Sequence, residues 1–263
     1  MFLRTDLAIE TINAEKIAEN GIKVEEERHG KIIKTRQKTA ENEYITFSLP
    51  PLMLYGEACH EAEMLLSQSI TALLPKKRNY VLVVGLGNTD ITPDALGPLS
   101  AKRVLATRHI GKELAVQLNL GDLKSVAVLS PGVLGQTGIE AAELILSVCK
   151  KTNPDAVIVI DALCAGSTER LGCTVQLTDA GISPGSGVKN SRAKIDSEYL
   201  GVPVIAVGMP TVIDIGKQKT EAEFLVTPKD IDLLIDRAAK LLGNAINFSL
   251  QPDIEPDYLI SLV

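Results

Sequence analysis

From Asn79 onward, short apolar segments alternate with segments of helical length. Val81–Leu86 and Ala156–Ile160 are apolar throughout, as a strand is when both faces of its sheet are covered. Asp94–Arg108 and Gly138–Lys150 lie between such runs and are predicted helices. Alternation of this kind predicts βαβ units. We therefore expect an α/β fold with a mainly parallel sheet flanked by helices.

The rest of the chain adds further elements to this pattern. The additional predicted strands and helices are Tyr44–Leu49, Ser125–Leu129, Cys173–Leu177 and Pro203–Val207 (strands), and Glu57–Leu74 and Lys229–Leu242 (helices). Residues 1–43 are polar and rich in charge, which predicts an N-terminal arm or hairpin that turns at residues 25–31. We expect one domain, 1–263, without internal repeats.

Charge and composition exclude several classes of function. The net charge is −6, whereas a general nucleic-acid binder needs a basic surface. No apolar run reaches the ~18 residues that a membrane-spanning helix needs, and the first residues lack the apolar core of a signal peptide. The four cysteines form no CxxC pair, which predicts free thiols in a reducing compartment. We expect an intracellular protein that binds neither nucleic acid directly nor membranes.

A glycine-containing turn, Gly85–Asn88, follows the first buried strand. A dinucleotide-binding fingerprint needs a third glycine three positions after Gly87, and Asp90 stands there instead. Because a carboxylate beside a pyrophosphate is unfavourable, we do not expect a nucleotide cofactor. Asp94 comes next, after Thr92-Pro93, and two interpretations stay open for it. It either starts a helix and interacts with the helix dipole, or carries chemistry.

Asp161 comes directly after the apolar run Ala156–Ile160, and ligands of open α/β sheets bind outside the carboxyl ends of strands. In the strand order 2-1-3, the strands that precede Asp94 and Asp161 are neighbours, about 4.8 Å apart. Two carboxylates held close together do not both ionise easily, so one keeps a proton. Such a pair can act as general acid and general base on a water molecule. Taken alone, Asp161 is equally well explained as a loop cap.

The same pair could instead hold a divalent metal ion, for which histidine is a common further ligand. His29, His60 and His109 fall in the polar arm or in predicted helices, and are predicted to be surface or packed residues. We therefore expect no metal and no other cofactor. No GxSxG motif is present, and no histidine can be placed beside Cys164, so a covalent nucleophile is not expected. Three other acids are either a third carboxylate or loop caps: Asp90, Asp179 and Asp214.

The stretch 179–201 is long for a loop and rich in glycine and serine, and such loops are usually functional or disordered. Within it, the segment Gly181–Lys194 contains three cations, which we expect to pair with acidic residues of a substrate: Lys189, Arg192 and Lys194. The alternative is a solvated basic loop.

Several of these segments belong to a set of motifs that runs over nearly the whole chain. The motifs are Arg4–Ala8, Gly85–Asn88, Thr92–Pro98, Pro131–Val133, Gly135–Gly138, Ile160–Leu163, Gly181–Ile182, Pro184–Val188, Pro203–Gly208 and Pro210–Thr211. In this order they resemble the spore germination protease family of endospore-forming bacteria. The chain is shorter than typical members of that family, which predicts that an insertion around the core is missing or trimmed.

The resemblance implies an endopeptidase that degrades small acid-soluble, DNA-protecting spore proteins during germination, in the cytoplasm of the developing spore or in the spore core. It also implies a tetramer, and a fold similar to that of the hydrogenase-maturation proteases. The family is classed among atypical aspartic proteases, and its two proposed aspartates match Asp94 and Asp161.

The resemblance further implies a zymogen that trims its own N-terminus. The family cuts after an acidic residue and before a large apolar residue followed by alanine, which places the cut between Asp6 and Leu7 and makes residues 1–6 a short propeptide. Two other functions stay open. One is a metal-dependent peptidase of the hydrogenase-maturation type, and the other is a non-enzymatic α/β protein that binds a small molecule.

Overall fold

The computed structural model describes residues 5–12, 21–52, 57–117, 120, 123–185, 193–217 and 223–263. Its strands are β1 (Lys23–His29), β2 (Ile32–Lys38), β3 (Glu43–Ser48), β4 (Tyr80–Gly85), β5 (Ser125–Leu129), β6 (Ala156–Ala165), β7 (Thr174–Thr178), β8 (Val204–Lys217) and β9 (Glu223–Val226). Its helices are α1 (Ala8–Thr11), α3 (Glu57–Leu73), α4 (Leu96–Lys102), α5 (Lys112–Gln117), α6 (Leu134–Thr137), α7 (Ala141–Thr152), α8 (Ser197–Leu200), α9 (Ile231–Leu250) and α10 (Pro256–Ser261), with 3₁₀ turns at Thr92–Asp94 and Thr168–Arg170. None of the helices in this part of the chain has the length and apolar character to cross a bilayer.

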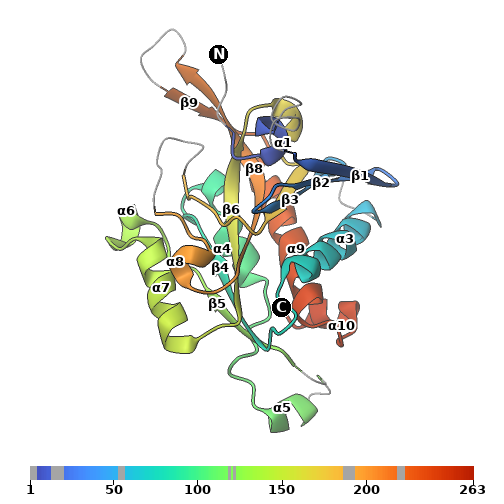
Figure 1. Ribbon diagram of the computed structural model, residues 1–263, viewed down its shortest axis with the longest axis vertical. Coiled ribbons are helices and arrows are strands. Elements are labelled where there is room, and N and C mark those ends of the chain that lie inside the picture. The colour runs from blue at the N-terminus through green and yellow to red at the C-terminus, as the bar shows by residue number, and fades with distance from the viewer. Residues whose placement is uncertain are drawn as a thin grey trace.

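The strands form one mixed sheet in the order β1-β2-β3-β7-β8-β6-β4-β5, and β9 pairs with β8 (Figure 1). Strands β5, β4, β6 and β8 are parallel to their neighbours in this half of the sheet. Because β4 pairs with both β5 and β6, the expected 2-1-3 order is present. The other half is antiparallel. The α/β class is therefore confirmed, with an antiparallel extension joined to the parallel strands.

Helices cover both faces of the parallel strands, which explains their continuous apolar runs. Successive residues of a strand point to opposite faces. Val83 of β4 packs in one core with Leu66 of α3 and Leu242 of α9. Its neighbour Val84 belongs to a second core with Ile145 of α7. Figure 1 shows α7 on one side of these strands and α3 and α9 on the other.

Two strands extend further than the apolar runs predict. The apolar run of β6 ends at Ile160, but β6 continues to Ala165 because it pairs with β8, with a register shift between Leu163 and Cys164. Strand β8 likewise runs on to Lys217. In contrast, the helix predicted over Asp94–Arg108 is shorter in the structure, where α4 covers only Leu96–Lys102. The strand extensions place residues predicted to follow strands, such as Asp161, within them.

The polar N-terminal region is part of the sheet. Strands β1 and β2 form a hairpin that turns at Gly30, whose φ of 54° lies in the left-handed region that glycine adopts easily. Strand β1 is mostly exposed, which explains its run of charges, while β2 buries Ile32 and Gln37. Strand β3 connects the hairpin to β7 and so to the parallel half.

Candidate active site

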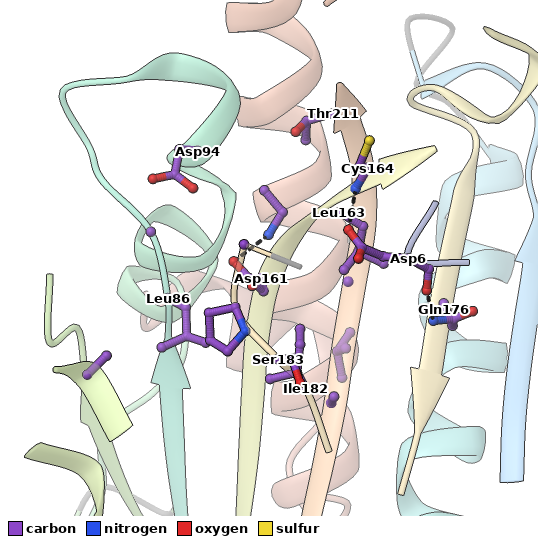
Figure 2. Close-up of a pocket in the computed structure, with 18 of the residues that line it drawn as sticks. Asp6, Leu86, Asp94, Asp161, Leu163, Cys164, Gln176, Ile182, Ser183 and Thr211 are labelled. Atoms are coloured by element: carbon purple, nitrogen blue, oxygen red, sulfur yellow. Dashed lines mark hydrogen bonds between the residues drawn. The ribbon is translucent and has the colours of Figure 1, made fainter. Parts of the chain in front are cut away.

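A cavity of about 780 Å³ lies at the carboxyl ends of the parallel strands. This is where open α/β sheets bind their ligands. Both predicted aspartates, Asp94 and Asp161, line it, and so do Asp6, Gln176 and Lys194. Figure 2 shows Asp94 and Asp161 toward one end of the cavity, and Asp6 and Gln176 toward the other. The structure therefore brings the two aspartates to one site, although they are far apart in sequence.

Asp94 is held by the loop that joins β4 to α4. It closes the 3₁₀ turn Thr92–Asp94, and its carboxylate accepts a hydrogen bond of 2.8 Å from the backbone N–H of Asn88. Thr92 does not cap this turn, since the residue at the cap is Ile91 and no side-chain capping bond forms. The carboxylate is thus bound to its own loop and is half-buried at the cavity wall.

The glycines of this region let the loop that carries Asp94 pack closely against the ends of β4 and β6. A Cβ atom on Gly97, in the first turn of α4, would lie 2.1 Å from the Leu86 carbonyl oxygen and 2.5 Å from the Ile160 carbonyl oxygen. A Cβ on Gly87, which has a φ of 120°, would lie 1.9 Å from the Asp94 carbonyl oxygen. These glycines therefore pack α4 and its loop directly onto the ends of β4 and β6. This packing gives a steric reason for the glycines in the turn Gly85–Asn88 that does not depend on a bound nucleotide.

Asp161 lies within β6, opposite Gly208 of β8. Its exposed fraction is 6%, and its Oδ1 accepts a hydrogen bond of 2.9 Å from the Ala162 N–H. Burial of a carboxylate is costly unless hydrogen bonds compensate it. The prediction that Asp161 follows the strand is wrong in this detail, because pairing with β8 keeps residues 161–165 extended.

Two further contacts hold the loops of the site together. Thr211 of β8 is buried and donates from its hydroxyl to the Pro93 carbonyl oxygen at 2.8 Å, which ties β8 to the turn that carries Asp94. The Gln136 side chain of α6 donates to Asn88 Oδ1 at 2.7 Å and to Asp90 Oδ2 at 3.0 Å. The types of these two residues did not predict these roles, although Thr211 and Gln136 lie in motifs that carry the resemblance.

The other candidate ligands lie elsewhere. His29, His60 and His109 are not among the residues that line the cavity. Within the described ranges, no group of three or more His, Cys, Asp and Glu side chains is arranged to hold a metal ion. Asp179 accepts a 2.8 Å hydrogen bond from the Glu43 N–H, as a loop cap does, and Asp214 is buried in β8.

Of the three predicted substrate-binding cations, Lys189 and Arg192 lie outside the described residues. Lys194 lines the cavity, but its ammonium group also lies 2.9 Å from Asp196 Oδ2. The pKa of Tyr44 is raised, mainly by burial, while the nearby charge of Lys194 lowers it. Lys194 therefore adds positive charge to this wall, and part of that charge is already balanced by Asp196.

The predicted cleavage bond between Asp6 and Leu7 is packed against the protein. Leu7 is fully buried, in a cluster with Leu163, Ala165 and Ile213. This differs from the exposed, flexible terminus at which proteolysis usually concentrates.

The fold and the site together define an enzyme-like α/β protein with acidic groups at the carboxyl ends of its parallel strands. The family model for the germination protease matches residues 4–222. The chain therefore belongs to the germination protease family, and it is a peptidase.

Named relatives agree with this assignment. A germination protease of Caldanaerobacter subterraneus subsp. tengcongensis is 39% identical, with 96% of this chain and 95% of that protein aligned. One of Clostridium tetani is 35% identical, with 97% of each covered. The first alignment runs over 310 positions, more than the 263 residues of this chain, so that relative contains residues that this chain lacks.

Among solved structures, the [NiFe] hydrogenase maturation protease HycI from Thermococcus kodakarensis KOD1 is 17% identical, with a TM-score of 0.41. The match covers 68% of this chain and 98% of that one.

Proposed function

We propose that this endopeptidase of spore germination hydrolyses small acid-soluble spore proteins with Asp94, Asp161 and a water molecule. The observation that carries the proposal is the placement of both side chains in one cavity at the carboxyl ends of β4 and β6. An extended peptide fits such a cavity, and a carboxylate pair supplies both a proton donor and a proton acceptor.

In the proposed reaction, the ionised aspartate takes a proton from water as the water oxygen attacks the carbonyl carbon of the peptide bond. The protonated aspartate donates its proton to the carbonyl oxygen. Collapse of the tetrahedral intermediate breaks the C–N bond, and the amine nitrogen leaves with the proton that the first aspartate had taken. The second aspartate takes back a proton from the hydroxyl that becomes the new carbonyl, which restores the starting pair. One carboxylate must therefore be protonated at the start, as close approach of two like charges favours.

Substrate binding in this proposal uses positive charge at the cavity wall. Lys194 lines the cavity, and Lys189 and Arg192 belong to the same segment of the sequence. Their ammonium and guanidinium groups would pair with acidic residues that flank the cleaved bond. The protein would act in the cytoplasm of the developing spore or in the spore core, as a tetramer that first removes residues 1–6.

Digestion of a purified small acid-soluble spore protein tests the function. We expect a small number of cuts, each after an acidic residue and before an apolar one, identified by mass spectrometry of the fragments. Loss of cleavage on addition of a chelator, with recovery on addition of a divalent ion, would instead indicate a metal-dependent peptidase. An intact spore protein under all conditions would contradict the proposed substrate.

A further inference from the structure

The chain's own N-terminal segment, residues 5–10, is bound to the cavity wall by a specific set of contacts. The Gln176 side chain of β7 contacts its backbone at two points: Nε2 donates to the Asp6 carbonyl oxygen at 3.1 Å, and Oε1 accepts from the Ala8 N–H at 2.6 Å. These two groups flank Leu7. One side-chain amide therefore holds an extended backbone on both sides of a single residue.

The end of β6 recognises the acidic side chains of the same segment. The Cys164 N–H donates to Asp6 Oδ2 at 2.9 Å, and the Cys164 carbonyl accepts from the Asp6 N–H at 2.9 Å. The Gly166 N–H donates to Glu10 Oε2 at 2.8 Å. Backbone N–H groups therefore face both carboxylates, and such charge-assisted hydrogen bonds are stronger than neutral ones.

Between the two acids, the Leu7 side chain fills an apolar pocket made by Leu163, Ala165 and Ile213. Burial raises the pKa of the Cys164 thiol to about 11, and the nearby carboxylates add to this effect. The thiol therefore carries no negative charge beside the acidic segment. The contacts together select an acidic residue, then a large apolar residue, then a residue whose N–H is free to bind Gln176.

This set of contacts is separate from the aspartate pair. Asp161 and Gln176 are both register partners of Gly208, so one strand lies between them. Two strand spacings correspond to about 10 Å. Figure 2 shows Asp6 beside Gln176 and Cys164, away from Asp94. A segment held here is consequently bound beside the proposed catalytic pair.

We propose that Gln176, the Cys164 and Gly166 N–H groups and the Leu7 pocket form a peptide-binding subsite for extended acidic segments, and that residues 5–10 occupy it in this structure. The inference rests on the proposed function for its role in substrate recognition. After the N-terminal segment leaves, a protein substrate would dock a segment with the same acidic and apolar pattern here, and the bond that is cut would lie in a neighbouring part of the substrate, within reach of the aspartate pair. Gln176 then acts as a substrate-binding residue that recognises backbone.

The test uses full-length protein in an Asp161→Asn background, so that a peptide probe is not consumed. The probe is a fluorescent peptide with the sequence of residues 4–12. Leu7→Lys opens the subsite, because a charged side chain does not stay in an apolar pocket. We expect the probe to bind Leu7→Lys at least about tenfold more tightly than the unopened chain, since the tethered segment competes at high effective concentration.

Adding Gln176→Met to the Leu7→Lys chain should weaken binding about tenfold, because two hydrogen bonds are lost. The matched control is Gln37→Met, which replaces another buried glutamine of the same sheet whose Oε1 has no hydrogen-bond partner among the described residues. A probe with an ester in place of the amide between its Leu and Ala should bind Leu7→Lys more weakly. It should lose less with Gln176→Met than the amide probe does, because only the bond from Gln176 Nε2 to the Asp carbonyl oxygen is then left to lose. Equal affinity in the Gln176 and Gln37 variants would overturn the subsite.

A second measurement does not use the Leu7→Lys variant. Gln176→Met in the otherwise unchanged protein should accelerate hydrogen exchange of the Ala8 amide, and Gln37→Met should not. Unchanged exchange would also overturn the proposal. Neither experiment needs turnover, so a chain that passes both but leaves spore proteins intact retains the subsite and loses the proposed function.

Discussion

Asp94 and Asp161 are positioned by backbone groups and glycines. The Asn88 and Ala162 N–H groups each donate to one of the two carboxylates. Gly97 permits backbone contacts that any side chain would prevent. The chemistry proposed for the pair therefore depends on residues that carry no reactive group themselves.

We predict that Asp94→Asn and Asp161→Asn each lower kcat on a spore-protein substrate by at least about a hundredfold, and that the double variant is no worse than either one. The physical reason is that a pair which shares one proton fails when either member loses its ability to ionise. Steady-state kinetics on variants with unchanged circular dichroism make the measurement. Substantial turnover by either folded single variant would exclude the pair.

We also predict that Gly97→Ala destabilises the protein by about 1–3 kcal/mol, because its Cβ would press on the Leu86 and Ile160 carbonyl oxygens. Activity should fall as well, since α4 must move away from β6. Gly111→Ala is the control, because a Cβ there meets no atom within 4 Å. Thermal unfolding compares the stabilities of the two variants. Equal stability of Gly97→Ala and Gly111→Ala would contradict the predicted clash at Gly97.

At the scale of elements, the extension of β6 beyond Ile160 organises the site. It carries Asp161 and then Cys164, which binds the N-terminal segment, and Gly166 directly after the strand binds the same segment. The 3₁₀ turn and α4 are held against it by glycine packing, and Thr211 of β8 connects the turn to the next strand. One strand thus links the proposed catalytic pair to the segment that is expected to be removed.

We predict slow self-cleavage between Asp6 and Leu7. The segment must first leave the wall, because Leu7 is fully buried and the backbone groups of Asp6 are hydrogen-bonded. Mass spectrometry of protein incubated at mildly acidic and neutral pH should detect a new N-terminus at Leu7, and the Asp161→Asn variant should not produce it. If Asp6 and Leu7 stay joined under conditions in which the enzyme digests its substrate, self-processing is refuted.

At the scale of the whole molecule, the mixed sheet joins an antiparallel extension to a parallel α/β core, and the β8–β9 hairpin projects from this body (Figure 1). Three apolar side chains of β9 are exposed by more than two fifths: Phe224 (44%), Leu225 (51%) and Val226 (41%). Adjacent exposed apolar residues of this kind are typical of protein–protein contacts.

We therefore predict that the protein in solution has four times the 28.2 kDa mass of one chain, as the family resemblance implies, and that β9 contributes to the contact. Light scattering coupled to size-exclusion chromatography measures the mass. Phe224→Asp should lower it, whereas Val24→Asp, at another exposed apolar residue, should not. A mass of one chain for the unchanged protein would contradict the tetramer.

Much of this architecture was predictable from local patterns. Continuous apolar runs identified β4 and β6, because strands covered on both faces need apolar residues at every position. The expected 2-1-3 order then put the acids that follow these apolar runs at one edge of the sheet, so Asp94 and Asp161 could be paired from the sequence alone. Gln176 left a weaker signal, a polar residue inside the buried strand β7.

The sequence by itself determined the α/β class, the two acids and the motifs of the family, since these depend on the period and order of residues along the chain. Only the tertiary structure decided that β6 continues past Asp161, that glycines pack the Asp94 loop onto the ends of β4 and β6, and that residues 5–10 bind Gln176. These features depend on contacts such as that between Gln176 and Asp6, which are 170 residues apart. No local pattern encodes such a contact, because its partners meet only after the sheet has assembled.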